Sequence, residues 1–200
     1  MTVEKLIDVM KRKKYVVFVN DTKNYNLNIV GVRSKNRQAG KFDDKLYIFW
    51  KYKGQWTIRY FPITTDPGRY YLNNPLSPTG TAILKPGQYR GVWAIGLHRG
   101  KYKALVQVKP VTVIRDYNKD NTLDFDSKRE ETGLFGINLH RALPEAITVD
   151  VGKFSAGCQV TANSKDFDEI MDLAEKSAAI YGNSFSYTLL EESDFDDMEN

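Results

Sequence analysis

Apolar residues recur at helical spacing in two segments of this 200-residue chain. Residues 3–14 place four apolar residues three or four apart, which predicts an amphipathic helix that packs on the rest of the domain. Residues 164–181 carry a longer apolar stripe, with Asn163 or Ser164 as its N-cap and Gly182 as its end. The pattern therefore predicts two helices, one near each end of the chain.

Between the helices, short β-branched and aromatic runs alternate with polar turns, which is typical of antiparallel β-strands. The runs cover residues 15–19, 27–32, 46–50, 56–61, 92–95, 104–108 and 111–115, and residues 185–190 form a last one. Residues 62–90 are rich in Pro and Gly, which favours long surface loops that either flank a cleft or only connect strands. We therefore expect a mainly β fold with two helices, in a single domain of residues 1–190.

Charge is distributed unevenly along the chain, whose formal net charge is +4. Residues 191–200 carry six acids and no base, so residues 1–190 carry +10. The acidic segment 191–200 is expected to be a disordered tail. The charge of the body suits an anionic partner and is also ordinary for a soluble surface. The aromatic residues lie inside the strand runs, which indicates sheet packing and no nucleic-acid binding.

The first fourteen residues interrupt every apolar run with charges, so they resemble neither a signal peptide nor a spanning helix. A protein made in the cytoplasm, with no integral membrane segment, is the expectation. No cofactor motif is present in the sequence.

Cys158 is the only cysteine, and His140 is one of two histidines. A single cysteine forms no internal disulfide, and a Cys/His zinc site would lack ligands. A thiol and an imidazole are the groups that a cysteine nucleophile and its general base require. Gly157 permits a tight turn in which its N–H and that of Cys158 face an oxyanion, and Ser155 adds a small donor and acceptor. The alternative is an inert core thiol, because free cysteines are often buried.

The order of these residues, with fourteen positions between His140 and Ser155 and then Gly157 and Cys158, resembles the signature of the L,D-transpeptidase (YkuD-like) catalytic domain. The Pro-Thr-Gly-Thr run at residues 78–81 is similar to a stretch that precedes the motif in that family. The local variant Ser-Ala-Gly-Cys-Gln-Val also resembles a motif of bacteriophage proteins. The chain departs from the family at Ala156, usually a histidine, and at Val160, usually an arginine or asparagine.

The resemblance implies an antiparallel, sandwich-like β domain that acts on peptidoglycan. Cys158 would attack an amide carbonyl of the stem peptide, and His140, oriented by the Arg141 carbonyl, would take the thiol proton. The thioester would pass to water, which we expect, or to an amine, which gives a cross-link. Hydrolysis suits phage-type wall degradation or trimming, by a protein released on lysis or carried in a virion. The alternative outside enzymology is a non-catalytic phage structural or wall-binding module.

Arginines near the motif are candidates for binding the substrate carboxylate, namely Arg99, Arg115 and Arg141. His98 lies in a Leu-His-Arg sequence that repeats the Leu-His-Arg around His140. Two interpretations of His98 stay open. Either it assists the cysteine in place of the missing histidine, or it is an exposed turn residue.

One further segment spaces acidic and amide oxygens at every second position, namely Asp116, Asn118 and Asp120. A calcium loop begins in this way. The sixth position lacks the expected glycine, and Ser127 stands at the twelfth in place of glutamate. The segment is therefore a candidate calcium site with an incomplete pattern.

Overall fold

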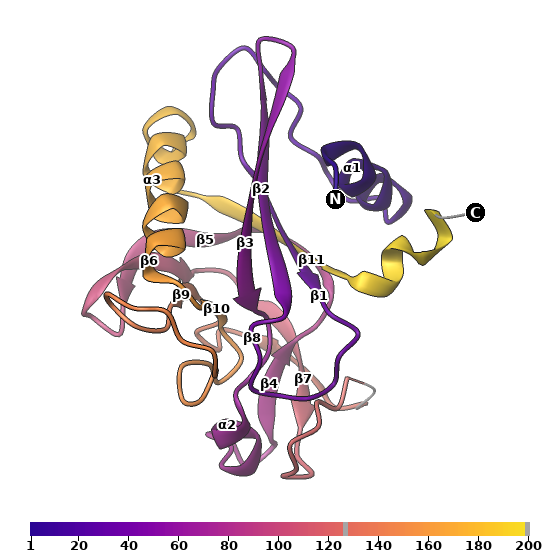
Figure 1. The fold of residues 1–200 in the computed structure, drawn as a ribbon, viewed down its shortest axis with the longest axis vertical. Helices are drawn as coiled ribbons and strands as arrows, with labels where there is room; N and C mark the ends of the chain where they lie inside the picture. The colour runs from indigo at the N-terminus through magenta and orange to yellow at the C-terminus, as the bar shows by residue number, and fades with distance from the viewer. Residues whose placement is uncertain (126–127, 199–200) are drawn as a thin grey trace.

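The structure is a computed structural model, and it describes residues 1–125 and 128–198. Its main sheet closes into a barrel with the strand order β1-β11-β5-β6-β9-β10-β3-β2 (Figure 1). These strands are β1 (Asn28–Arg33), β2 (Asp44–Tyr52), β3 (Gln55–Thr64), β5 (Gly87–His98), β6 (Tyr102–Gln107), β9 (Leu139–Arg141), β10 (Gln159–Thr161) and β11 (Phe185–Glu191). A separate three-stranded sheet contains β4 (Thr81–Leu84), β7 (Val111–Asp116) and β8 (Glu130–Gly133).

Most neighbouring strands are antiparallel, but β1 runs parallel to β11, and β9 runs parallel to β10. A parallel pair needs a crossover connection, and residues 142–158 supply it between β9 and β10. The register places Val160 opposite His140 and Gln159 opposite Leu139. Cys158 therefore ends the crossover, directly before β10 and beside the strand that carries His140.

Two amphipathic helices pack on different sides of the barrel (Figure 1). α1 (Val3–Arg12) begins at Thr2, whose hydroxyl accepts a hydrogen bond from the Lys5 N–H. Its buried residues pack against apolar side chains of β1, β2 and β11. α3 (Ser164–Tyr181) begins at Asn163 and contacts β6, β9 and β10. Because α3 buries its apolar stripe in the main core, it supports the strands that flank Cys158.

The main core lies inside the barrel, and two of its aromatic residues are tied to the chain around the candidate site. Trp93 and Tyr187 stack with their ring centroids 4.4 Å apart. Buried Trp and Tyr need partners for their polar atoms. The indole N–H of Trp93 donates to the Ile137 carbonyl at 2.8 Å, and the Tyr187 hydroxyl donates to the Gln159 side chain at 2.7 Å. The core therefore fixes the chain just before His140 and just after Cys158.

The predicted mainly β character is confirmed, and so are both predicted helices, which the structure places at Val3–Arg12 and Ser164–Tyr181. The strands, however, form a closed barrel and a small second sheet where a sandwich was expected. Residues 62–90 are also more regular than the predicted loops. They contain the short helix α2 (Arg69–Asn73), all of β4 and the first residues of β5.

Residues 15–19 are not a strand, although their apolar run predicts one. Side-chain amides take the place of a neighbouring strand here. The Gln88 amide bonds both the N–H and the carbonyl of Val16, and the Asn28 amide bonds both groups of Phe18. The backbone groups of Val16 and Phe18 are thus hydrogen-bonded without a neighbouring strand.

The acidic end of the chain is ordered as far as it is described, where a disordered tail was expected. β11 continues to Glu191, and η1 (Glu192–Met198) is a 3-10 helix. It lies beside the basic end of α1, where the Lys13 ammonium pairs with Asp194 at 2.7 Å and Arg12 donates to the Asp194 carbonyl at 2.8 Å. Cations of α1 thus compensate acidic charge of this segment. Residues 199–200 lie outside the described part of the chain.

Candidate functional site

A cleft of about 400 Å³ lies between the barrel and the three-stranded sheet. Cys158, His140 and His98 all line it, together with Arg99 and Arg115. Among the described residues that line it there is no Asp or Glu. We call it the cysteine cleft. The chain's only thiol and both of its imidazoles therefore meet at one concave surface, although they come from three separate segments.

The thiol of Cys158 is half-buried, and its Sγ donates a hydrogen bond to the Gly136 carbonyl at 3.2 Å. Burial raises the pKa of Cys158 above its usual value of 9.0. The thiol is therefore neutral at physiological pH, and a nucleophilic role requires a base that removes its proton during the reaction.

The turn before Cys158 depends on Gly157, which has a φ of 121°. A Cβ at this position would stand 2.4 Å from the Ala82 carbonyl oxygen of β4. Only glycine allows the turn to approach the second sheet this closely without strain. Gly157 therefore fixes the depth at which Cys158 sits between the two sheets.

Ser155 is fully buried and braces the same turn. Its hydroxyl accepts the Gly157 N–H at 3.1 Å and donates to the Cys158 carbonyl at 2.9 Å. The sequence predicts that the Gly157 N–H faces an oxyanion. This prediction is wrong, because the Gly157 N–H already donates to the Ser155 hydroxyl. No hydrogen bond among the described residues takes the Cys158 N–H, which is left as the backbone donor of this turn. Ser155 is thus a positioning residue.

His140 lies on β9 and is 4% exposed. Its Nδ1 lies 2.8 Å from the Arg141 carbonyl oxygen, and an acceptor there requires the proton on Nδ1. The Nε2 atom consequently carries the lone pair. Burial, followed by the neighbouring His98 and Arg99, lowers the pKa of His140 to about 3. The ring is a neutral imidazole, which is the form that accepts a proton.

His98, at the end of β5, is 8% exposed, so it is not the exposed turn residue that the sequence left open. Its ring stacks on the His140 ring with centroids 4.0 Å apart and planes 22° apart. Burial and Arg99 lower its pKa as well. We call these two rings the imidazole pair. Because burial is the main cause that lowers both pKa values, both rings are neutral at physiological pH in the free protein.

Asn138 sets the tautomer of His98. The Asn138 Oδ1 accepts the Gln107 N–H at 2.8 Å, so its amide nitrogen faces the Nδ1 of His98 at 3.0 Å. An amide N–H donates, so the Nδ1 of His98 accepts and its proton lies on Nε2. The imidazole pair therefore offers two different groups, a lone pair on Nε2 of His140 and an N–H on Nε2 of His98.

Of the three arginines predicted to bind the substrate carboxylate, Arg99 and Arg115 line the cysteine cleft and Arg141 does not. Arg115 lines the cysteine cleft and is held by Glu131 at 2.7 Å and by the Gly80 carbonyl at 3.2 Å. Arg141 stands over the Tyr102 ring, 4.4 Å from its centroid, and lines a neighbouring groove. Asn138 is a site residue that was not predicted from the sequence. Its position two residues before His140 was an available signal, because alternate residues of a strand share a face.

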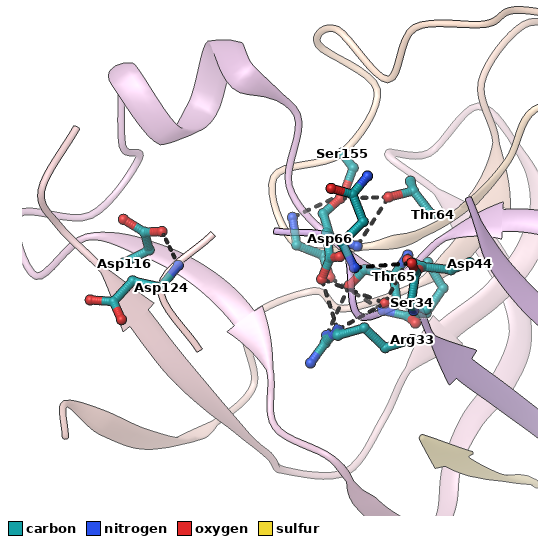
Figure 2. Close-up of polar contacts among 12 residues, drawn as sticks. Arg33, Ser34, Asp44, Thr64, Thr65, Asp66, Asp116, Asp124 and Ser155 are labelled. Atoms are coloured by element: carbon teal, nitrogen blue, oxygen red, sulfur yellow. Dashed lines mark hydrogen bonds and ion pairs between the residues drawn. The ribbon is translucent and has the colours of Figure 1, made fainter. Parts of the chain in front are cut away.

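Within the described residues, no group of three or more His, Cys, Asp or Glu side chains could hold a metal ion, and Ser127, the twelfth position of the calcium-loop candidate, lies outside them. Asp116 is fully buried at the end of β7, and its Oδ2 accepts the Asp124 N–H (Figure 2). The oxygens of Asn118 and Asp120 accept backbone N–H groups two residues ahead. These side chains therefore shape their own turn.

A buried charged network joins the end of β1, the start of β2 and the residues after β3 (Figure 2). Arg33 pairs with Asp66 at 2.9 Å, and both the N–H and the hydroxyl of Thr65 donate to Asp44. The chain then continues to Gly68, whose N–H donates to the Ser155 carbonyl at 2.9 Å. The network thus positions the residue that braces the cysteine turn. Burial and the neighbouring Asp66 raise the pKa of Asp44 to about 7.

Comparisons with models of known protein families, with curated proteins and with solved structures found no match for this chain. Within the described residues, no helix is both long and apolar enough to cross a bilayer.

Proposed function

We propose that the chain is a cysteine enzyme that forms an acyl-enzyme with a peptidoglycan stem peptide and hydrolyses it. One observation carries the proposal: Cys158 shares a cleft with His140, whose Nδ1 is bonded to the Arg141 carbonyl so that Nε2 is left as a base. The substrate class rests on the resemblance of the motif to L,D-transpeptidases. We propose further that the β-rich fold is a variant of that family's sandwich-like domain.

In acylation, the Sγ of Cys158 attacks the amide carbonyl carbon while its proton passes to Nε2 of His140. The Cys158 N–H stabilises the oxyanion, and the Nε2–H of His98, whose ring stacks on His140, is a side-chain donor beside the base. The C–N bond then breaks, and His140 returns the proton to the leaving amine. Water attacks the thioester next, which releases the new carboxylate and restores the thiol.

The cleft also supports an anionic substrate. Arg115 lines it, and none of the described lining residues carries a carboxylate that would repel a negatively charged ligand. A carboxylate of the stem peptide is therefore assigned to Arg115. Glu131 already accepts hydrogen bonds from Nε and Nη2 of Arg115. Arg115 would therefore bind the substrate carboxylate while it stays paired with Glu131.

Digestion of purified stem peptides in water enriched in oxygen-18 tests the proposal. Hydrolysis should leave one heavy oxygen in the new carboxylate, whereas cross-linking would give a dimer without it. Mass spectrometry should find no product with Cys158→Ala. A carbapenem should add one mass equivalent to the wild type and none to that variant. Equal labelling of the two proteins would refute the nucleophile.

A non-catalytic wall-binding module is the second candidate, and one observation favours it. Ser155 occupies the Gly157 N–H, so the turn offers a single backbone donor to an oxyanion. Loss of one such donor typically costs about 10²- to 10³-fold in rate. Under this alternative the stem peptide binds and is recovered intact, with the same affinity in the wild type and in Cys158→Ala.

A further inference from the structure

A second groove adjoins the cysteine cleft and has a volume of about 180 Å³. The two share His98, His140, Arg99 and Phe154 in their linings, so the imidazole pair stands where they meet. We call this second cavity the basic groove. In the part of the chain that the structure describes, four cationic side chains line it and no Asp or Glu does; the cations are Arg99, Lys101, Arg141 and Lys153.

These four cations are not neutralised by the protein. Across the residues that the structure describes, none of the four takes part in an ion pair. Elsewhere on the surface such pairs are common, as between Lys103 and Glu175 at 2.8 Å or Lys85 and Glu130 at 2.7 Å. Like charges around a concavity repel one another and raise the local positive potential, so the arrangement is stabilised when an anion binds.

The groove is held in shape before any ligand arrives. The Arg141 guanidinium stands over the Tyr102 ring, and the Lys153 ammonium lies 4.1 Å from the centroid of the Tyr70 ring. Arg99 has a φ of 50° in the tight turn between β5 and β6, where the Lys101 N–H donates to the His98 carbonyl at 3.0 Å. The side chains of Arg141 and Lys153 are therefore placed before an anion binds, which lowers the entropic cost of ordering them.

We propose that the basic groove is an anion-binding subsite for an oxyanion, either a carboxylate or a phosphate, on a ligand whose adjoining part lies in the cysteine cleft. Arginine guanidinium groups bind both oxyanions in bidentate geometry, which accounts for two of the four cations being arginines. The volume equals that of about six water molecules, at ~30 Å³ each, which suits one such group with its adjoining carbons. The link to the cysteine cleft rests on the proposed function, whereas anion binding itself does not.

Titration of the full-length Cys158→Ala protein with inorganic phosphate tests the site, with ionic strength held constant by NaCl. The chain has only two histidines, both at this groove, so their ring resonances in NMR report binding directly. We expect saturable shifts of both rings. The double variant Arg141→Gln/Lys153→Gln should weaken phosphate binding by about tenfold or more.

The matched control is Lys85→Gln/Lys103→Gln, which removes the same charge from outside the groove. It should bind phosphate as the parent does. Shifts that do not saturate beyond NaCl, or equal affinities of the groove and control variants, would overturn the proposal. Because the parent lacks the thiol, failure of turnover in the wild type leaves this result untouched.

Two stem peptides then separate the sources of the anion. If the ligand's oxyanion is a substrate carboxylate, a tetrapeptide with a free C-terminal carboxylate displaces phosphate and its C-terminal amide does not. If neither peptide displaces phosphate while phosphate itself saturates, the groove is a phosphate site independent of the stem peptide. Both outcomes support an oxyanion site, and equal displacement by the two peptides would contradict the placement of a C-terminal carboxylate in the groove.

Discussion

Replacing Gly157 with alanine should displace the cysteine turn from the second sheet. Carbon atoms do not approach a carbonyl oxygen closer than 3.0 Å, and the added Cβ would stand 2.4 Å from the Ala82 oxygen. The turn and β4 must therefore separate by about 0.6 Å. The φ of 121° adds strain of about 1–3 kcal/mol for any residue with a side chain.

Together these effects predict a loss of about 2–4 kcal/mol in the free energy of unfolding. For a chain of this length, that loss lowers the melting temperature by roughly 5–15 °C. The turn carries the thiol, so acylation of Cys158 should slow by about 10- to 10²-fold, because small misplacements of a reacting group are costly. Calorimetry and the rate of carbapenem labelling measure the two effects.

Gly152→Ala is the matched control, since Gly152 lies in the same crossover loop with a φ of 48° and open space around its Cβ position. It should cost only the backbone strain, about 1–2 kcal/mol, and leave labelling unchanged. If Gly157→Ala is no less stable than Gly152→Ala and labels at the wild-type rate, the close approach to β4 does not position Cys158, and the reasoning fails.

Three more predictions concern ionisable and polar groups around the cleft. His140→Ala should lower turnover about 10²- to 10⁴-fold with circular dichroism unchanged, and an active variant would reassign the base. Asn138→Ala should act through the His98 tautomer, so it should lower kcat in the wild type and add little in a His98→Gln background; additive losses would contradict this. The raised pKa of Asp44, about 7 against 3.8, means that the folded state binds its proton more tightly than the unfolded chain. The free energy of unfolding therefore falls as the pH rises from about 4 to 7. In urea unfolding, the stability of the wild type relative to Asp44→Asn should decrease over that range. A difference independent of pH would place the Asp44 pKa near its ordinary value.

The helices could be predicted from the sequence because their determinants are local. The apolar stripe of α3 and its cap at Asn163 lie within one segment, and the structure gives the expected bounds. The strand predicted at residues 15–19 is wrong because strand formation depends on non-local neighbours. Whether an apolar run joins a ladder depends on what lies beside it, and here Gln88 and Asn28 lie beside it with side-chain amides.

In the candidate site, too, the features with local determinants could be predicted and the non-local ones could not. Cys158 and His140 could be named from their scarcity and spacing, and the short repeat of Leu-His-Arg around His98 was visible in the sequence. The stacking of His98 on His140 was not, because it arises where β5 and β9 flank β6, and strand order is a non-local property. The partner of the Gly157 N–H was likewise decided by the side-chain orientation of Ser155.

The parallel pairing of β1 with β11 has a consequence for how the chain folds. Ile29 pairs with Tyr187, more than 150 residues away, and this contact closes the barrel. During synthesis β1 leaves the ribosome long before its partner, so one of its edges stays open until β11 (Phe185–Glu191) has been made. Contacts of such long sequence separation are formed late and slowly. We therefore expect β1 to be the segment most exposed to self-association in nascent chains, and protection of its amides from hydrogen exchange to appear only together with that of β11.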